Sequence, residues 1–281
     1  MTAIRQANIT SNRPFITEIW KVCFTNDTEY INLFIDYCLP YSTTWLLEKE
    51  HRAVSLLTLI PSYFTDIKSS SLSNGGYIYG VGTLPDYRGH SYSKALLERA
   101  ASYAKDNHLD YLIVRPAYNS LYPLYERAGF EIPLFENELQ EELGEIVPNA
   151  AFTDISPKEL LLLRENQDIF LWPIDILIYT TKEILMRGGV VAVKDGLYYC
   201  AYPLDSDPDT VCVLETNARS EHEINQIMSS AKSRYPQAKS VIIKGRFLSS
   251  MSMRQNRSGL LFPISEGSKF NHPSRLSLPM E

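Results

Sequence analysis

The sequence has few cysteines and no long apolar run. No segment reaches the roughly 20 apolar residues that a membrane-spanning helix needs, and residues 1–8 lack the apolar core of a secretory signal. The 281 residues include four cysteines, which form neither a C-x-x-C pair nor a metal-type cluster: Cys23, Cys38, Cys200 and Cys212. We therefore expect no membrane partner, no metal and a reducing, cytoplasmic location.

Positive charge is also scarce. The chain has 27 Lys and Arg against 33 Asp and Glu, a net charge of −6. This balance argues against a nucleic-acid partner and favours a cationic or neutral substrate. With 44% hydrophobic and 21% charged residues, the composition is that of a globular protein, and its length suits two domains. Composition leaves the oligomeric state open.

Hydrophobic periodicity predicts mixed α and β structure in the first half. Apolar spacing favours helices, β-branched runs favour strands, and a Ser-, Asn- and Gly-rich stretch favours a flexible loop. The expected elements are helices over 15–24 and 29–38, a hairpin over 43–47 and 53–60, a loop over 66–76, strands over 77–83 and 111–114, and a helix over 91–108. This order is a β-loop-α-β unit with a right-handed crossover.

The joint between the strand over 77–83 and the following helix is the most informative feature. Arg88 and Gly89 stand in this turn, and the helix opens at Ser91. The first amides of a helix lack intrahelical partners and lie at the positive end of its dipole. A turn that directs several of them into one place predicts a phosphate site, and hence a nucleotide-bearing cofactor. Glycines ahead of the turn, Gly80 and Gly82, indicate a bulge or a close approach to the strand.

Two separated motifs resemble those of the GNAT family of acetyl-CoA-dependent N-acetyltransferases, over residues 1–135. Arg88 stands at the arginine of the family's R-x-x-G-x-G/A loop, with Gly89 directly after it, while Ser91 and Ser93 replace the expected small residues. A later segment, residues 119–130, resembles the family's N-x-x-A-x-x-x-Y-x-x-x-G-F segment and is one residue shorter. Its matching residues are Asn119, Tyr125, Gly129 and Phe130.

The resemblance implies a GNAT fold, an α/β (α+β) arrangement with a mixed central sheet and flanking helices. It also implies that acetyl-CoA is bound by the backbone of the glycine-interrupted strand, by the turn and by the opening helix. The expected contacts are Val81, Thr83, Arg88, Gly89, Ser91, Tyr92, Ser93, Lys94 and Asn119. On its own Asn119 would be interpreted as a helix cap, and Arg88 as a surface charge.

Tyr125 is the expected catalytic residue. Transfer from a thioester requires a proton for the departing thiolate, and a nearby tyrosine hydroxyl can donate it. Tyr122 is the alternative. An acceptor amine must also lose a proton, and the candidates for that base are Glu48, Glu50 and, as in the related Eis-type enzymes, the terminal carboxylate at Glu281.

Residues 136–156 are acidic and are expected to link two domains, and they could also complete the first sheet. In the second half, helices are expected over 157–164 and 172–186, and then a hairpin, strand, helix and strand repeat the earlier order. The turn over 216–219 lacks the phosphate-loop pattern. We therefore interpret 157–281 as a degenerate second GNAT-like α/β domain in a tandem, Eis-like arrangement, with 250–281 as a tail. A sterol-carrier-like or unrelated α+β module is the alternative.

The sequence thus predicts an acyltransferase that moves an acetyl group from acetyl-CoA to a primary amine of a small molecule or peptide. Transfer would be direct, in a ternary complex. Ser91 and Ser93 leave another class open, because their Cβ atoms crowd the place where a phosphate approaches. The alternative is a catalytically silent acyl-CoA-binding or scaffold protein that retains the fold.

Overall fold

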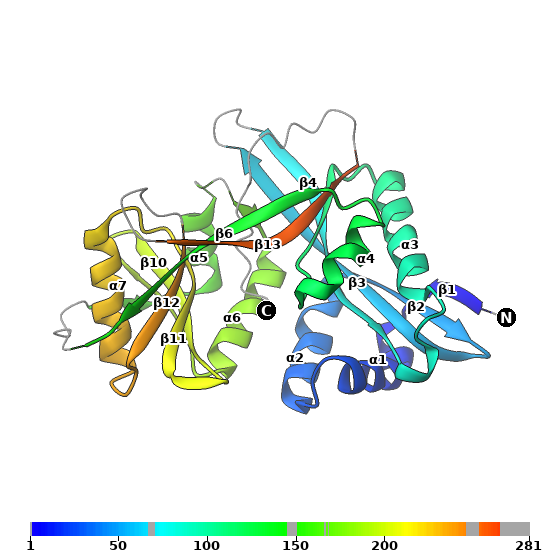
Figure 1. The fold of residues 1–281 in the computed structure, drawn as a ribbon, viewed down its shortest axis with the longest axis horizontal. Coiled ribbons are helices and arrows are strands. Elements are labelled where there is room, and N and C mark those ends of the chain that lie inside the picture. Colours follow the sequence, from blue (N-terminus) through cyan, green and yellow to red (C-terminus); the bar gives the residue numbers. More distant parts are fainter. Residues whose placement is uncertain are drawn as a thin grey trace. The chain divides into compact units, whose positions relative to one another are not determined.

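The computed structural model describes residues 2–66, 71–144, 151–165, 167, 169–245 and 253–264. The chain divides into two compact units, each built from strands and covering helices (Figure 1). Among the described residues, unit 1 holds 2–134, 171–179 and 258–264, and unit 2 holds the remainder. The architecture is therefore mixed α/β, as the sequence predicts.

Unit 1 contains a mixed sheet in which consecutive strands are neighbours. Its strands are β1 (Thr2–Gln6), β2 (Thr43–Lys49), β3 (Arg52–Asp66), β4 (Ser71–Thr83) and β5 (Tyr111–Val114). The pairs from β1 to β4 are antiparallel, whereas β4 and β5 are parallel. The predicted β-loop-α-β unit is thus confirmed.

The helices of unit 1 are α1 (Ile9–Cys23), α2 (Thr28–Tyr37), α3 (Tyr92–Asp106) and α4 (Tyr122–Glu126), with short 3-10 turns η1 (Leu39–Tyr41), η2 (Pro85–Tyr87) and η3 (Asn119–Leu121). The helix α1 begins six residues before its predicted start at 15. The side chain of Asn8 accepts a hydrogen bond from the Ser11 amide and caps this earlier start.

The expected loop over 66–76 is wrong at residue 66 and over 71–76, because β3 extends to Asp66 and β4 begins at Ser71, while 67–70 lie outside the described residues. Here the two strands form a long hairpin with pairs such as Tyr63 with Asn74. The ladder satisfies the backbone whatever the side chains are, so polar residues are tolerated on a hairpin that projects from the core. Gly75 serves packing instead, since a Cβ there would lie 2.3 Å from the Tyr111 ring.

The expected tail over 250–281 is also wrong where the structure describes it. Residues Arg254–Pro263 form β13, and its last part, Leu260 to Pro263, pairs antiparallel with β5 in unit 1. Leu260 and Leu261 are buried. Residues 260–263 therefore extend the first sheet beside β5, while residues 265–281 lie outside the described residues.

Unit 2 repeats the order hairpin, strand, helix, strand. Its elements are β6 (Ile132–Glu142), β7 (Thr153–Asp154), α5 (Pro157–Arg164), β9 (Val190–Lys194), β10 (Leu197–Leu204), β11 (Asp207–Thr216), α7 (Glu221–Arg234) and β12 (Ser240–Gly245). β11 and β12 are parallel across α7, as β4 and β5 are across α3. Between α5 and β9 lie β8 (Phe170–Leu171) and α6 (Ile174–Met186).

Residues 136–142 of the expected acidic linker belong to β6, which pairs antiparallel with β12. Leu134, Glu136 and Leu139 are buried in this strand, whereas residues 140–142 at its end are exposed. The buried Glu136 carboxylate lies 3.8 Å from the Lys244 ammonium. The acidic composition, which predicts a linker, gives no sign of these buried positions or of the partner strand.

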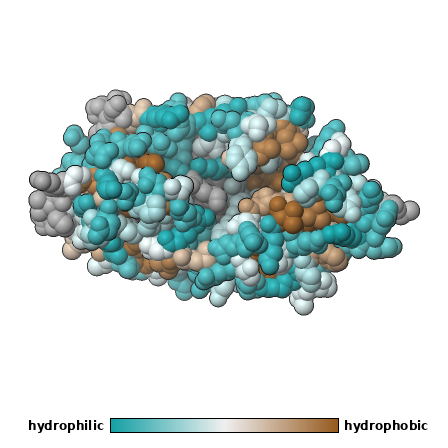
Figure 2. Space-filling model, turned by 60° about the horizontal axis from the view of Figure 1, so that its bottom comes forward, coloured by the Kyte–Doolittle hydropathy of each residue, from teal (hydrophilic) through white to brown (hydrophobic). Residues whose placement is uncertain are grey.

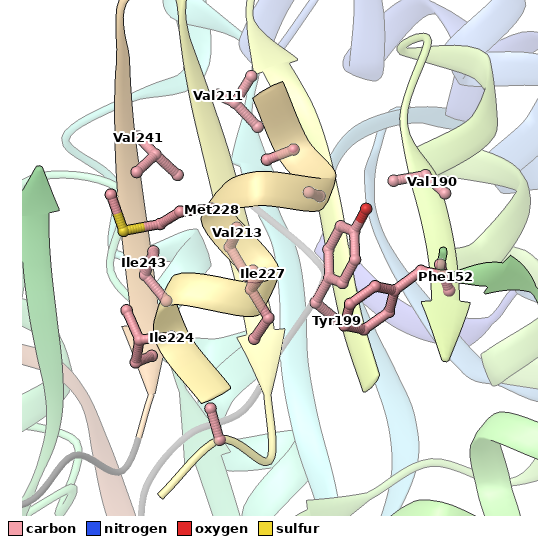
Figure 3. Packing of buried hydrophobic residues seen from close by; sticks show 14 of the residues in the cluster. Phe152, Val190, Tyr199, Val211, Val213, Ile224, Ile227, Met228, Val241 and Ile243 are labelled. Carbon is pink, nitrogen blue, oxygen red and sulfur yellow. The ribbon is translucent and has the colours of Figure 1, made fainter. Parts of the chain in front are cut away.

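The core of unit 2 forms between α7 and its sheet (Figure 3). Ile224, Ile227 and Met228 of α7 pack over valines and isoleucines of β11 and β12, while the rings of Tyr199 and Phe152 meet edge to face with centroids 5.1 Å apart. The repeated element order therefore encloses a core of its own.

Hydrophilic residues cover much of the face shown in Figure 2, with hydrophobic residues in separate patches. Within the described ranges, no helix has both the length and the apolar character needed to cross a membrane.

Candidate active site

The edge of β4 opens beyond its pairing with β5. That pairing ends at Ile78 and Val114, where β5 itself ends. The Leu84 amide donates to the Val54 carbonyl (2.9 Å), which fixes the direction of the backbone here. Because backbone groups alternate in direction along a strand, those of Thr83 point away from β3. They point to the open side.

A bulge bends β4 on this open stretch. Gly80 has a φ of +60°, and the register with β3 shifts between Leu56 and Thr58. The bulge predicted from the glycines is thus confirmed. The close approach comes from α1, because a Cβ on Gly80 would lie 3.0 Å from the Trp20 ring and one on Gly82 would lie 2.9 Å from the Phe24 ring.

The turn after β4 reverses the chain through two residues with positive φ. Gly89 has a φ of +80°, and Ser91, which precedes α3, has a φ of +60°. For a residue with a Cβ, the left-handed conformation costs about 1–2 kcal/mol. His90 stacks on Tyr92 with ring centroids 5.6 Å apart, which packs the turn against the first turn of the helix.

The start of α3 is uncapped. The first backbone bond into the helix runs from the Ala95 amide to the Ser91 carbonyl, and the Ser91 hydroxyl makes no capping bond. The amides of residues 91–94 have no hydrogen-bond acceptor within the part of the chain that the structure describes. Their donors and the dipole of a 15-residue helix suit an anion.

The side chain of Arg88, in the turn after β4, bonds to the last residue of that strand. Its Nε donates to the Thr83 carbonyl (3.1 Å), and the Cys23 thiol donates to the same oxygen (3.4 Å). Burial raises the pKa of the Cys23 thiol, and a hydrogen bond with Arg88 opposes that rise. The sequence placed Thr83 and Arg88 at this site, but it held no signal that Cys23 joins them.

Tyr125 lies in the core of unit 1 with its side chain 6% exposed. It shares a hydrophobic cluster with Ile78 and Val114, the residues at which β4 and β5 separate, and Val81 packs against that cluster. Burial alone raises the pKa of Tyr125 to about 12. Its phenol is therefore protonated at neutral pH.

The second motif positions this tyrosine. Gly129, with a φ of +96°, ends α4 and lets the Phe130 amide donate to the Tyr125 carbonyl (3.1 Å). The ring of Phe130 then meets that of Tyr125 edge to face at 5.9 Å. Asn119 is exposed at the start of η3, and no side chain caps η3 or α4, so Asn119 does not act as a helix cap.

The comparisons with known proteins agree with this geometry. A sequence model of the "Acetyltransferase (GNAT) domain" matches residues 3–132. Residues 3–132 are a GNAT acetyltransferase domain. A search of curated proteins gave no match.

Solved structures similar to the chain extend the likeness to both halves. A probable N-acyltransferase from Enterococcus faecalis has a TM-score of 0.75 at 12% identity, over 94% of this chain and 73% of that one. Eis1 from Mycobacterium abscessus has a TM-score of 0.68 at 14% identity, over 94% of this chain and 74% of that one. A tandem GNAT protein from the clavulanic acid biosynthesis pathway has a TM-score of 0.54 at 12% identity, over 95% of this chain and 100% of that one. At these identities the likeness shows the fold, a GNAT fold followed by a second GNAT-like half.

Neither described candidate base of the GNAT domain is an unpaired buried carboxylate. Glu48 accepts a hydrogen bond from Arg5, which lowers the pKa of the carboxyl and makes it a weaker base. Glu50 is exposed at the tip of the β2–β3 hairpin with a φ of +52°. Glu281 lies outside the described residues.

In the second half, the helix that corresponds to α3 begins with caps. The Ser220 hydroxyl accepts from the Glu223 amide (3.2 Å), and the Glu223 carboxylate accepts from the Arg219 amide (2.7 Å). These bonds occupy the Glu223 amide in the first turn of α7 and the Arg219 amide just before the helix, and the carboxylate would repel a phosphate. The missing loop pattern thus corresponds to a helix start closed by its own side chains.

Proposed function

We propose that this protein transfers an acetyl group from acetyl-CoA to a primary amine of a small molecule or peptide, directly within a ternary complex. The observation that carries the proposal is the uncapped start of α3, residues 91–94, beside an open edge of β4. Donors and an open strand edge are what a phosphate-bearing, amide-containing arm requires.

The residues present fit acetyl-CoA. The amides of Ser91, Tyr92, Ser93 and Lys94 would hold its pyrophosphate, and the Ser91 hydroxyl is not turned onto them. Backbone groups on the open edge, at Val81 and Thr83, would bind its pantetheine arm, with Gly89 shaping the turn and Asn119 as a further contact. When bound, this cofactor supplies an activated acetyl thioester. We propose no metal, because a thioester needs no Lewis acid to react with an amine.

Tyr125 would act as the general acid. Its raised pKa keeps the proton on the phenol until a thiolate forms nearby, and the surrounding apolar side chains exclude water from that transfer. Tyr122, the alternative acid, is also buried on α4 and lies one turn earlier in the helix. The fixed backbone of α4, ended at Gly129, orients the phenol.

The acceptor side favours a cation. The net charge of −6 would attract an ammonium group and would repel nucleic acid. We propose action in the cytoplasm, with residues 1–135 as the catalytic domain and 157–281, apart from the segments 171–179 and 258–264 that belong to unit 1, as a GNAT-like domain without a cofactor site of its own. The capped start of α7 supports that division of roles.

A silent acyl-CoA-binding or scaffold protein is the second candidate. It is favoured by Ser91, whose left-handed conformation carries a cost that glycine would avoid. Such a protein would bind CoA and would leave every amine unmodified.

The test is release of free thiol from acetyl-CoA with a panel of acceptors: spermidine, an aminoglycoside and a peptide with a free N-terminus. Binding of CoA, followed by thermal shift, is measured in parallel. Turnover with any amine supports the acetyltransferase. Binding without turnover supports the silent protein, and the absence of both contradicts the two candidates together.

A further inference from the structure

We propose that Arg88 is a positioning residue that holds the carbonyl of Thr83, and that it is not a ligand of the cofactor's phosphates. The inference rests on the proposed function and assigns this arginine a task within the same site. It concerns how the loop is tied to the strand along which the cofactor's arm would lie.

The contacts of the guanidinium carry the proposal. Its Nε donates to the Thr83 carbonyl at 3.1 Å, a good hydrogen-bond distance for a charged donor. Cys23, at the end of α1, donates its thiol to the same oxygen at 3.4 Å. Arg88, Thr83 and Cys23 therefore join three segments, namely the loop, β4 and α1.

The position of this carbonyl gives the contact its consequence. Thr83 is the last residue of β4, and its backbone polar groups face the open side where an arm would pair. The neighbouring carbonyl of Gly82 accepts a hydrogen bond from the Ser55 hydroxyl on β3 (2.7 Å). Because both carbonyls are fixed by side chains, the end of β4 keeps one geometry. Val81 offers the nearest backbone groups on the open edge that no side chain holds.

The hydrogen bond from Arg88 to the Thr83 carbonyl, here called the Arg88 clamp, also fixes the position of the proposed phosphate-binding turn. Arg88 directly precedes Gly89, whose positive φ starts the turn into α3. Anchoring the side chain of Arg88 to the end of β4 closes residues 83–88 into a small ring. The amides of 91–94 are thereby held in register with the strand edge, which lowers the entropy lost when a cofactor binds.

Lys94 provides the matched control. It is exposed at the first turn of α3, near the proposed phosphates, and its ammonium lies 3.7 Å from Glu98 on the next turn. Removing its charge changes the local potential at the helix start. It leaves the bonds to Thr83 in place.

The experiment compares acetyl-CoA with acetyl-pantetheine, which lacks all phosphates, in wild type, Arg88→Met, Arg88→Lys and Lys94→Met. For Arg88→Met we expect kcat/KM to fall by about threefold to tenfold with both thioesters, as for the loss of one hydrogen bond. The ratio of the two kcat/KM values should match that of wild type at low and high salt. Arg88→Lys should restore part of the activity, and Lys94→Met should lower the value only with acetyl-CoA.

Hydrogen exchange of the unliganded protein supplies a readout that does not need turnover. Arg88→Met should speed exchange of the hydrogen-bonded amides of the loop, those of Leu84, Tyr87 and position 88, whereas Lys94→Met should not. A loss confined to acetyl-CoA and sensitive to salt, or unchanged exchange in Arg88→Met, would overturn the clamp. If no thioester is used by wild type, the acetyltransferase proposal fails, and the exchange result alone decides the role of Arg88.

Discussion

Tyr125 is the residue that we propose as the general acid. It lies among apolar neighbours of unit 1, and burial raises the pKa of its phenol to about 12. A sequence motif located this residue, but the sequence could not give its burial or its pKa. Those depend on packing against β5 and β13, and β13 comes from far along the chain.

Replacing Tyr125 by Phe should lower kcat by about 100-fold or more, because general acid catalysis contributes factors of that size. The affinity for CoA should change by less than about twofold, since the hydroxyl acts on the leaving group. Steady-state kinetics and calorimetry measure the two quantities, with Tyr122→Phe as the matched control. An unchanged kcat would remove Tyr125 from the mechanism.

The raised pKa also predicts the pH profile. A phenol with its ordinary pKa of about 10 would lose half its proton at that pH, whereas one with a pKa of about 12 keeps nearly all of it. The ratio of kcat for wild type to that for Tyr125→Phe should therefore stay constant from about pH 7 to about pH 10. A ratio that halves by about pH 10 would show that the phenol titrates normally.

At the scale of elements, α3 and α7 hold corresponding places in the two units but begin differently. α3 starts from a left-handed, uncapped Ser91, whereas α7 starts from an N-cap at Ser220. The sequence alone shows this cap, through the spacing of Ser220 and Glu223. It did not predict the conformation of Ser91, since its φ is set by the packing of the turn.

The two serines of the loop should respond oppositely to glycine. Ser91→Gly should leave the free energy of unfolding unchanged or raise it by up to about 1 kcal/mol, because glycine adopts the left-handed conformation without cost. Ser93→Gly, inside the first turn of α3, should lower it by about 0.5–1 kcal/mol. Urea denaturation measures both. A loss of stability in Ser91→Gly larger than that in Ser93→Gly would contradict the strained turn.

The strands divide into those that the sequence predicts and those that it does not. Residues 111–114 were predicted as a buried strand and form β5. The polar ends of β3 and β4 and the distant β13 were not predicted, and a strand in the acidic segment that forms β6 was only the alternative to a linker. Each of them is a strand because of a partner, and pairing between distant segments leaves little trace in local composition.

At the scale of the whole molecule, the two units repeat one element order but differ in polar interior. In unit 2, Arg164 is fully buried and its Nε donates to the Glu215 carboxylate (2.7 Å), which also accepts from the Tyr198 hydroxyl (2.6 Å). Glu215 lies near the end of β11, beyond the residues paired with β12. A charge pair thus stands where unit 1 has the open edge of β4.

Breaking this pair should destabilise the protein strongly. Arg164→Met would leave a buried carboxylate without its cation, at a cost of about 3–5 kcal/mol, whereas Arg164→Met combined with Glu215→Leu should recover most of that loss. Thermal denaturation of the single and double variants measures both. A single variant as stable as wild type would contradict the importance of the pair.

The most direct test of the central claim is calorimetric titration of the full chain with CoA. The uncapped helix of unit 1 and the capped helix of unit 2 predict saturable binding with a stoichiometry of one CoA per chain. Binding of two CoA molecules per chain would contradict the claim. So would the absence of binding at about 1 mM CoA, which corresponds to a binding free energy weaker than about −4 kcal/mol.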